Sequence, residues 1–274
     1  KDLTIENRSR HRKVSGSLEH TSFHHPTKVN QSKNTHPLPA GTVLLEASGL
    51  GLQQDDRWLF RKLELSLRSG EFLALSGPSG VGKTSLLHAL AGLRAPTEGK
   101  VIPFPETDPG ELDRGDRRVG IIFQDLLLTP NASLLQNVLC GRLKDHSSLS
   151  TLFGFPREEE EEALALLHDL DLGEIAGKWV AETSRGEQQR VAIARAIHQE
   201  PVIYLADEPV ASLDQKLADR VLGNLVNQAR NEAKAIACVL HDPAQIERFA
   251  DRVLELDYGD PEGWKIRKID RQTP

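Results

Sequence analysis

The sequence of 274 residues predicts an α/β protein with a mostly parallel central sheet. Short apolar runs alternate along the chain with segments whose apolar residues recur every three or four positions, as buried strands and their connecting helices do. A glycine-rich loop also lies between one apolar run and a leucine-spaced segment. Hydrophobic residues make up 38% of the chain, which is enough to fill the core of such a domain.

The glycine-rich loop has the pattern G-x-x-x-x-G-K-[ST] of a phosphate-binding P-loop. Its glycines let successive N–H groups point at a polyphosphate, and the dipole of the following helix adds positive potential. We expect Lys83 to reach the β- and γ-phosphates and Thr84 to offer its hydroxyl to Mg²⁺. A glycine turn that binds nothing would leave Lys83 and Thr84 without a purpose. We therefore predict a P-loop NTPase that binds a nucleoside triphosphate through Gly77, Pro78, Ser79, Gly80, Val81, Gly82, Lys83, Thr84 and Ser85.

Polar side chains follow several apolar runs directly, where a parallel strand would end. The runs that we interpret as parallel strands are residues 72–75, 119–123, 202–206, 236–240 and 253–256. Gln124, Asp207-Glu208 and His241 each come after one of them. Because ligands of open parallel sheets lie at the carboxyl ends of the strands, we expect these side chains beside the P-loop.

These polar residues suit the hydrolysis of a triphosphate. We expect Asp207 to hold Mg²⁺ and Glu208 to orient and deprotonate the attacking water. Gln124 can touch the metal and the water through its amide, and His241 can bond to the γ-phosphate. Two acids that merely end a strand are the alternative, but this does not explain why the pair follows a P-loop by the length of an α/β domain.

A second, antiparallel sheet is predicted ahead of the P-loop. Apolar residues occupy alternate positions in the segment 60–67, which is the period of a half-buried strand. Ser69-Gly70 then turns the chain into the strand that precedes the P-loop. We expect a small N-terminal antiparallel β-subdomain beside the main sheet.

Helical patterns fill the remaining segments. Leu217, Val221 and Leu225 recur every four residues, and Asp242-Pro243 supplies an N-cap and a first-turn proline. Residues 125–182 show helical patterns without a strong strand, so we predict an inserted helical subdomain there.

Five consecutive glutamates, residues 158–162, open one helix of this insert after a proline. Their charges face the positive end of the helix dipole, and we interpret them as a solvated face. Leu164, Leu167 and Leu170 should be buried beyond them.

The first 42 residues differ in charge from the rest of the chain. Residues 1–42 hold seven Lys/Arg against three Asp/Glu and scarcely an apolar period, so we expect a disordered tail or an overlong start before a domain at 43–274. The remainder holds 27 basic and 37 acidic residues, since the whole chain has 34 and 40. This acidic body argues against a nucleic-acid partner.

Other site classes find little support. His24-His25 lacks a third ligand at metal-binding spacing. Cys140 and Cys238 stand in apolar contexts and are expected as buried thiols. No apolar run reaches the length of a membrane span, and the first residues lack the hydrophobic stretch of a signal peptide, so we expect a soluble protein.

One further helix start can cradle a phosphate. The segment 183–197 opens with Ser184 and Gly186, and exposed N–H groups at such an N-terminus bind anions. The P-loop already serves this chain's own nucleotide. A second phosphate-binding helix start makes best sense if it faces the nucleotide of another copy.

Over residues 43–257 the sequence resembles the ATP-binding subunits of ABC transporters. The motifs occur in the family's order: the P-loop, Gln124 as the Q-loop, residues 184–189 as the signature, 204–209 as Walker B, 211–214 as the D-loop and His241 as the switch histidine. The resemblance implies a head-to-tail homodimer that sandwiches two ATP molecules. Each ATP would be held with Mg²⁺ by one P-loop and by Ser184 and Gly186 of the other chain.

The resemblance also implies partners. Closure of the dimer would drive two membrane permease subunits, gripped near the Q-loop and the helical insert, with a solute-binding protein as an indirect partner. The protein would then lie peripherally at the cytoplasmic face of the inner (plasma) membrane. Residues 137–143, 150–156 and 205–214 look most like the phosphonate-import type.

The sequence departs from the family at two places. The signature usually reads Leu-Ser-Gly-Gly-Gln, whereas Thr183, Arg185 and Glu187 stand here, so we expect weakened or altered closure. The position expected under the adenine falls near Leu52-Gln53, and neither residue is aromatic. Trp58 could substitute, although a packed tryptophan is the plainer interpretation.

Two other functions stay open at this point. The chain could be the ATPase of a lipoprotein-release or efflux complex in the same superfamily. It could instead be a soluble accessory protein of phosphonate breakdown without a membrane subunit. Residues 257–274 also lack the family's usual closing segment, so no regulatory C-terminal domain is expected.

Overall fold

The computed structural model describes residues 39–106, 116–146 and 154–270. The tail predicted for residues 1–42 therefore falls almost wholly outside the described residues, and so does His24-His25. Most of the segment 150–156 and the last four residues also lie outside them.

The central sheet has six strands in the order β5-β6-β7-β3-β8-β9. Neighbours from β5 to β8 run parallel, and only β9 runs antiparallel, to β8. This confirms the mostly parallel sheet. The strands are β3 (Phe72–Ser76), β5 (Val119–Ile122), β6 (Ile203–Ala206), β7 (Ala235–Val239), β8 (Arg252–Glu255) and β9 (Lys265–Lys268).

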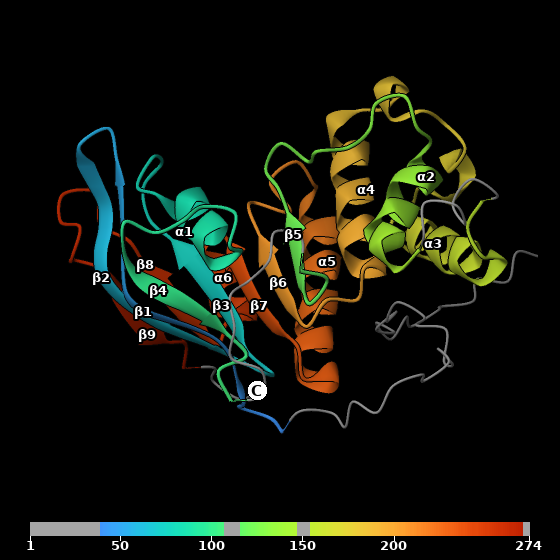
Figure 1. The fold of residues 1–274 in the computed structure, drawn as a ribbon. Coiled ribbons are helices and arrows are strands. Elements are labelled where there is room, and N and C mark those ends of the chain that lie inside the picture. The colour runs from blue at the N-terminus through green and yellow to red at the C-terminus, as the bar shows by residue number, and fades with distance from the viewer. Residues whose placement is uncertain (1–38, 107–115, 147–153, 271–274) are drawn as a thin grey trace, which may run out of the picture.

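A second sheet of three antiparallel strands lies beside the first (Figure 1), in the order β2-β1-β4. Its strands are β1 (Val43–Gln54), β2 (Arg57–Arg68) and β4 (Glu98–Pro103). Leu63, Leu65 and Leu67 of β2 are buried and alternate with more exposed residues, as their period predicts. The expected N-terminal antiparallel sheet is therefore present, with β4 added to it from beyond the P-loop.

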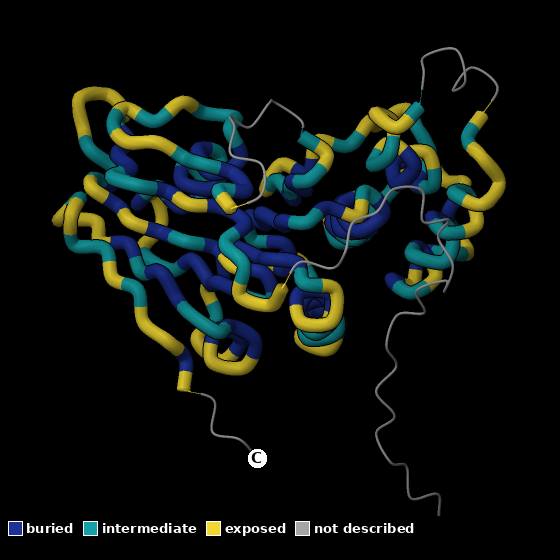
Figure 2. The backbone as a smooth tube through the Cα atoms, turned by 60° about the horizontal axis from the view of Figure 1, so that its bottom comes forward, coloured by how far each residue is buried: buried dark blue, intermediate teal, exposed yellow. Residues whose placement is uncertain are grey.

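The central sheet is covered on both faces because its strands are apolar on both. In β3, Phe72 and Ala74 belong to one hydrophobic core, while Leu73 and Leu75 belong to the other. The second core includes α1 (Lys83–Leu90) and the antiparallel sheet. The first includes α5 (Gln215–Glu232) and α6 (Pro243–Phe249), and Figure 2 shows how the buried stretches gather along the middle strands.

The helical part of the molecule packs at the β5 side of the central sheet (Figure 1). Its helices are α2 (Leu134–Leu139), α3 (Arg157–Asp169) and α4 (Arg185–His198), with short 3-10 turns at Cys140–Asp145, Gly173–Ile175 and Val180–Glu182. Both α2 and α3 contact α4, so the cluster extends past the predicted boundary at residue 182. No helix in the described part of the chain is both long and apolar enough to cross a bilayer.

The run of glutamates at the start of α3 is less solvated than predicted. Glu159 pairs with His146 at 2.9 Å, and their side chains are only 17% and 15% exposed. Glu162 pairs with Arg142. Leu167 and Leu170 are fully buried, but Leu164 is half-buried. The acidic run thus ties the helical part together, because one side of α3 faces the loop that contains His146.

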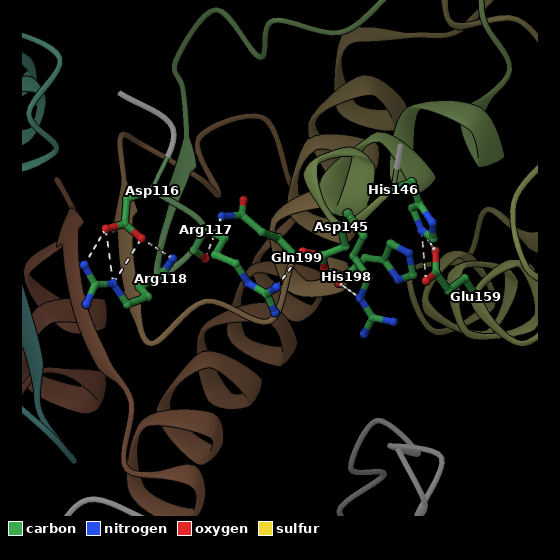
Figure 3. Close-up of polar contacts among 9 residues, drawn as sticks. Asp116, Arg117, Arg118, Asp145, His146, Glu159, His198 and Gln199 are labelled. Carbon is green, nitrogen blue, oxygen red and sulfur yellow. Dashed lines mark hydrogen bonds and ion pairs between the residues drawn. The ribbon is translucent and has the colours of Figure 1, made fainter. Parts of the chain in front are cut away.

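Arg142 links its own 3-10 turn to α3 and to the C-terminal end of α4, where His198 lies (Figure 3). It donates to the His198 carbonyl oxygen at 2.6 Å and pairs with Glu162 at 2.7 Å and with Glu200 at 3.2 Å. Its side chain is only 11% exposed. Burial also lowers the pKa of His198 to about 3, so the ring beside this arginine stays neutral.

Replacing Arg142 is therefore expected to destabilise the fold. Arg142→Ala leaves two partly buried carboxylates and a carbonyl without their donor, which should cost about 2–3 kcal/mol in the free energy of unfolding. The matched control is Arg157→Ala, since Arg157 pairs with Glu161 at a site where the side chains are 89% and 63% exposed. That change should cost no more than about 0.5 kcal/mol. Urea unfolding of the two variants checks this, and equal costs would contradict it.

Candidate functional site: a nucleotide pocket at the P-loop

The P-loop joins the end of β3 to the start of α1 at Lys83. Gly77 has a φ of +138°, and a Cβ there would lie 2.6 Å from the carbonyl oxygen of Leu256. Gly82 caps the helix with a φ of +112° and lies against Leu59. Side chains at either position would be strained, which explains the glycines of the motif.

Lys83 is held inside the loop. Its ammonium donates to the carbonyl oxygens of Gly77 and Pro78, each at 2.8 Å, and the residue is 7% exposed. Burial lowers the pKa of Lys83, whereas the carboxylates of Glu208 and Asp207 act in the opposite direction. The cation is thus held at the P-loop by two of its carbonyl oxygens, where it can meet a bound phosphate.

The predicted strand-end residues meet at one edge of the sheet. Gln124 follows β5, Asp207 and Glu208 follow β6, and His241 follows β7, and these three strands are neighbours. The ring Nε2 of His241 lies 2.8 Å from Glu208 Oε1. The geometry can therefore hold a water-activating carboxylate in a fixed orientation.

Asp207 is suited to hold a cation. It is only 5% exposed, and within the described part of the chain neither of its carboxylate oxygens has a hydrogen-bond partner. Burial raises the pKa of Asp207, and the nearby Thr84 hydroxyl acts against that rise. The described residues hold no cluster of three or more His, Cys, Asp or Glu that could bind a metal alone. Mg²⁺ fits this site, because it binds through one or two protein oxygens together with phosphates and water.

A cavity of about 470 Å³ runs along the P-loop. Eight of the predicted residues line it: Ser79, Gly80, Gly82, Lys83, Thr84, Ser85, Gln124 and Glu208. The other predicted residues do not, namely Gly77, Pro78, Val81, Asp207, His241, Ser184 and Gly186. Val81 is instead buried in the core, and the Gly77 and Pro78 carbonyls hold Lys83.

Sequence reasoning did not assign a role to Gln189, which positions Glu208. Its amide donates to the Glu208 carbonyl oxygen at 2.8 Å and accepts from the Ser212 N–H at 3.0 Å. Glu208 has a φ of +50°, a left-handed conformation that costs about 1–3 kcal/mol in a non-glycine residue. The buried Gln189 thus supports a strained backbone, and only the tertiary structure reveals this link between α4 and the end of β6.

The hydrogen-bond donors of Ser184 at the start of α4 are occupied by a side chain of the same helix. Ser184 caps α4, and Glu187 accepts from both the N–H and the hydroxyl of Ser184, at 2.7 and 2.8 Å. The bond from the Ser184 N–H lowers the pKa of Glu187. Arg185 donates to the carbonyl oxygen of Gln124. All three departures from the usual signature therefore make specific contacts, since the Thr183 hydroxyl donates to the Val180 carbonyl oxygen at 2.7 Å.

The cavity is also lined by residues that the sequence did not point to. They come from the β1–β2 hairpin: Gln54, Asp55, Arg57 and Leu59. Trp58 does not line the cavity; its ring packs against Gly51 and under Arg61. In the sequence these residues form a polar run between two segments of alternating apolar residues. Such a run predicts the tip of a hairpin, but it does not predict what lies next to that tip in space.

A second cavity of about 410 Å³ lies between the β5 edge and the helical part. Phe123, Leu127 and Leu143 contribute apolar surface, and Arg117 and Lys144 contribute positive charge. Figure 3 shows Arg117 beside Asp145 and Gln199, and Arg117 pairs with Asp145 at 2.6 Å. Cys140 also lines this cavity and is exposed, so the expectation of a buried thiol is wrong there, while Cys238 is buried as expected.

Comparison with known proteins gives consistent matches. Residues 60–211 match the sequence profile of the ABC transporter family. The chain is 39% identical over 205 residues to the phosphonates import ATP-binding protein PhnC of Trichormus variabilis, covering 74% of this chain and 84% of the relative. It is 43% identical over 202 residues to the phosphite import ATP-binding protein PxtA of Stutzerimonas stutzeri, covering 72% of each.

Solved structures are similar as well. A dimeric bacterial ABC transporter cassette aligns with a TM-score of 0.72 and 28% identity, covering 83% of this chain and all of the neighbour. The same values describe a cassette in a post-hydrolysis state bound to ADP and Pi.

Proposed function

Because the chain belongs to the ABC transporter family, we propose that it is the ATP-hydrolysing subunit of an importer for phosphonates or a related phosphorus oxyanion. The ATPase activity follows from the family. The substrate class is supported by the relatives, which are named for phosphonate and phosphite import. The observation that carries the proposal is the meeting of the P-loop cavity with the strand-end carboxylate of Glu208.

The side chains divide the work of hydrolysis between them. Lys83 and the N–H groups of the P-loop bind the β- and γ-phosphates. Glu208 takes the proton of the attacking water, and His241 orients this carboxylate and bonds to the γ-phosphate. Mg²⁺, held by Asp207, Thr84 and Gln124, would neutralise charge on the phosphates.

The active unit in this proposal is a head-to-tail homodimer. Ser184 and Gly186 do not line the cavity of their own chain, which suits a role at the nucleotide of a second copy. The structurally similar bacterial cassette, which is described as dimeric, supports the same assembly. In such a dimer the Glu187 carboxylate must release the Ser184 donors before they can bind phosphate, which agrees with altered closure.

The second cavity is the proposed contact with the two membrane permease subunits. It is lined by apolar residues and basic ones, and Phe123 precedes the Q-loop residue Gln124. A permease loop with apolar side chains would fit it, since Asp145 in the same lining already pairs with Arg117. The protein would then lie peripherally at the cytoplasmic face of the inner membrane, and a solute-binding protein would be an indirect partner.

Purification from native membranes tests the transport role. We expect the protein to co-purify with a polytopic permease, and ATP hydrolysis by the reconstituted complex to rise when a phosphonate-loaded binding protein is added. Stimulation without any binding protein, by a lipoprotein or another exported substrate, would favour the efflux alternative. A soluble complex with no membrane subunit would favour the accessory role in phosphonate breakdown.

A further inference from the structure

The nucleotide cavity extends beyond the part that phosphates need. It is lined by the P-loop and the start of α1, and also by residues of the β1–β2 hairpin. The hairpin turns at Asp55 and Asp56, which have φ values of +48° and +61°. If the phosphates bind at the P-loop, the nucleoside has to lie against this hairpin.

The hairpin presents a guanidinium instead of an aromatic ring. No Phe, Tyr, Trp or His is among the described residues that line the cavity, but Arg57 is. The guanidinium carbon of Arg57 lies 4.0 Å from the centroid of the Tyr258 ring. Arg57 also donates to the Tyr258 carbonyl oxygen at 3.3 Å. A planar guanidinium stacks well on flat π systems, so it can carry a purine on the face that Tyr258 leaves free.

Tyr258 belongs to a turn that is fastened to the hairpin. The turn lies between β8 and β9, and its Pro261 carbonyl oxygen accepts from the Arg61 N–H at 2.7 Å. The indole of Trp264 donates to the Arg61 carbonyl oxygen at 3.1 Å. Leu256, at the start of the same turn, touches Gly77 of the P-loop. The turn therefore sets the distance between the phosphate site and Arg57.

We propose that Arg57, stacked on Tyr258, is the platform on which the nucleobase of the bound nucleotide lies. The proposal rests on the proposed function only in requiring that a nucleoside triphosphate binds at the P-loop. Arg57 touches the base, and Tyr258 is a positioning residue that keeps the guanidinium flat. The segment after β8 thereby takes part in nucleotide binding, although its sequence suggested only a missing closing segment.

The test compares ATP with inorganic tripolyphosphate, which has the phosphates but no base. Affinities are measured by calorimetry without Mg²⁺, so that no hydrolysis occurs. Arg57→Ala should weaken ATP binding by about 5- to 20-fold, in the range of base stacking, and leave tripolyphosphate binding unchanged. Tyr258→Ala should weaken ATP binding by about 3-fold, and Tyr258→Phe should restore it, because the ring is what supports Arg57.

The control is Lys62→Gln, which removes a cation from the same strand and its ion pair to Glu262 of the same turn. It should leave both affinities unchanged. Equal weakening of ATP and tripolyphosphate by Arg57→Ala would show a phosphate contact and overturn the proposal. No weakening of ATP binding would overturn it too. A wild-type protein that binds neither compound would instead refute the nucleotide site on which the proposed function depends.

Discussion

Glu208→Gln is expected to lower the rate of ATP hydrolysis by about 10²- to 10⁴-fold while ATP binding persists. The carboxylate lines the cavity and lies 2.8 Å from His241 Nε2. The amide of glutamine has the same shape and can still bond to His241, but it cannot take a proton from water. Loss of turnover without loss of binding therefore isolates the proton transfer.

Phosphate release and size-exclusion chromatography measure the two halves of this prediction. With ATP and Mg²⁺ the variant should accumulate as a dimer, since hydrolysis no longer opens it. Glu247→Gln is the matched control, because Glu247 forms an exposed ion pair with Arg267 away from the cavity. Hydrolysis at the wild-type rate would refute the role of Glu208. A variant that stays monomeric at every concentration would refute the shared nucleotide site.

The features that sequence alone could predict are local in the chain. The P-loop glycines, the alternation of β2 and the polar residues after β5, β6 and β7 each depend on a few neighbouring positions. The parallel order of the strands then brings Gln124, Glu208 and His241 to one edge, because successive strands pair in one direction. This is why the candidate site could be assembled before the structure was known.

The features that escaped prediction depend on contacts between distant segments. The strands β4 and β9 are short, and only one of their residues, Pro103, is buried, so their sequences show no apolar period. Arg57 can be assigned a role only because it lies against Tyr258, which is about two hundred residues away in the sequence. Gln189 looked like one polar residue of a helix, yet it is buried and holds the backbone of Glu208. Such pairings leave no periodic signal.

The second large effect is expected for a substitution at Asp207, which should lower the rate of hydrolysis and raise the stability of the ligand-free protein. Asp207→Asn should reduce hydrolysis by at least about 100-fold, because a metal ligand supplies several kcal/mol of charge stabilisation. In the absence of Mg²⁺ and ATP the same change should stabilise the protein by about 1–3 kcal/mol. The reason is that the carboxylate is buried and its oxygens have no hydrogen-bond partner within good geometry among the described residues, so the nearby Thr84 hydroxyl and Lys83 ammonium offset the cost of burying its charge only in part.

The pH dependence of this stability difference shows whether the buried charge of Asp207 causes it. Burial raises the pKa of Asp207 in the folded state above its unfolded value, so the folded state binds this proton more tightly. The penalty is absent below the unfolded pKa, grows as pH rises through the raised folded pKa, and is constant above it. The advantage of Asp207→Asn should therefore be full above the raised pKa and shrink as the pH falls toward the ordinary range of an aspartic acid.

Thermal unfolding with and without Mg²⁺ and ATP measures this trade. Without them the midpoint of Asp207→Asn should lie about 2–8 °C above that of the wild type at neutral pH. With Mg²⁺ and ATP the difference between the two midpoints should become smaller or change sign, since only the wild type gains the full stabilisation from metal and nucleotide. The exposed Asp270→Asn should shift neither midpoint. A midpoint for Asp207→Asn below the wild type without ligands would mean that Asp207 is satisfied within the fold and is not waiting for a cation.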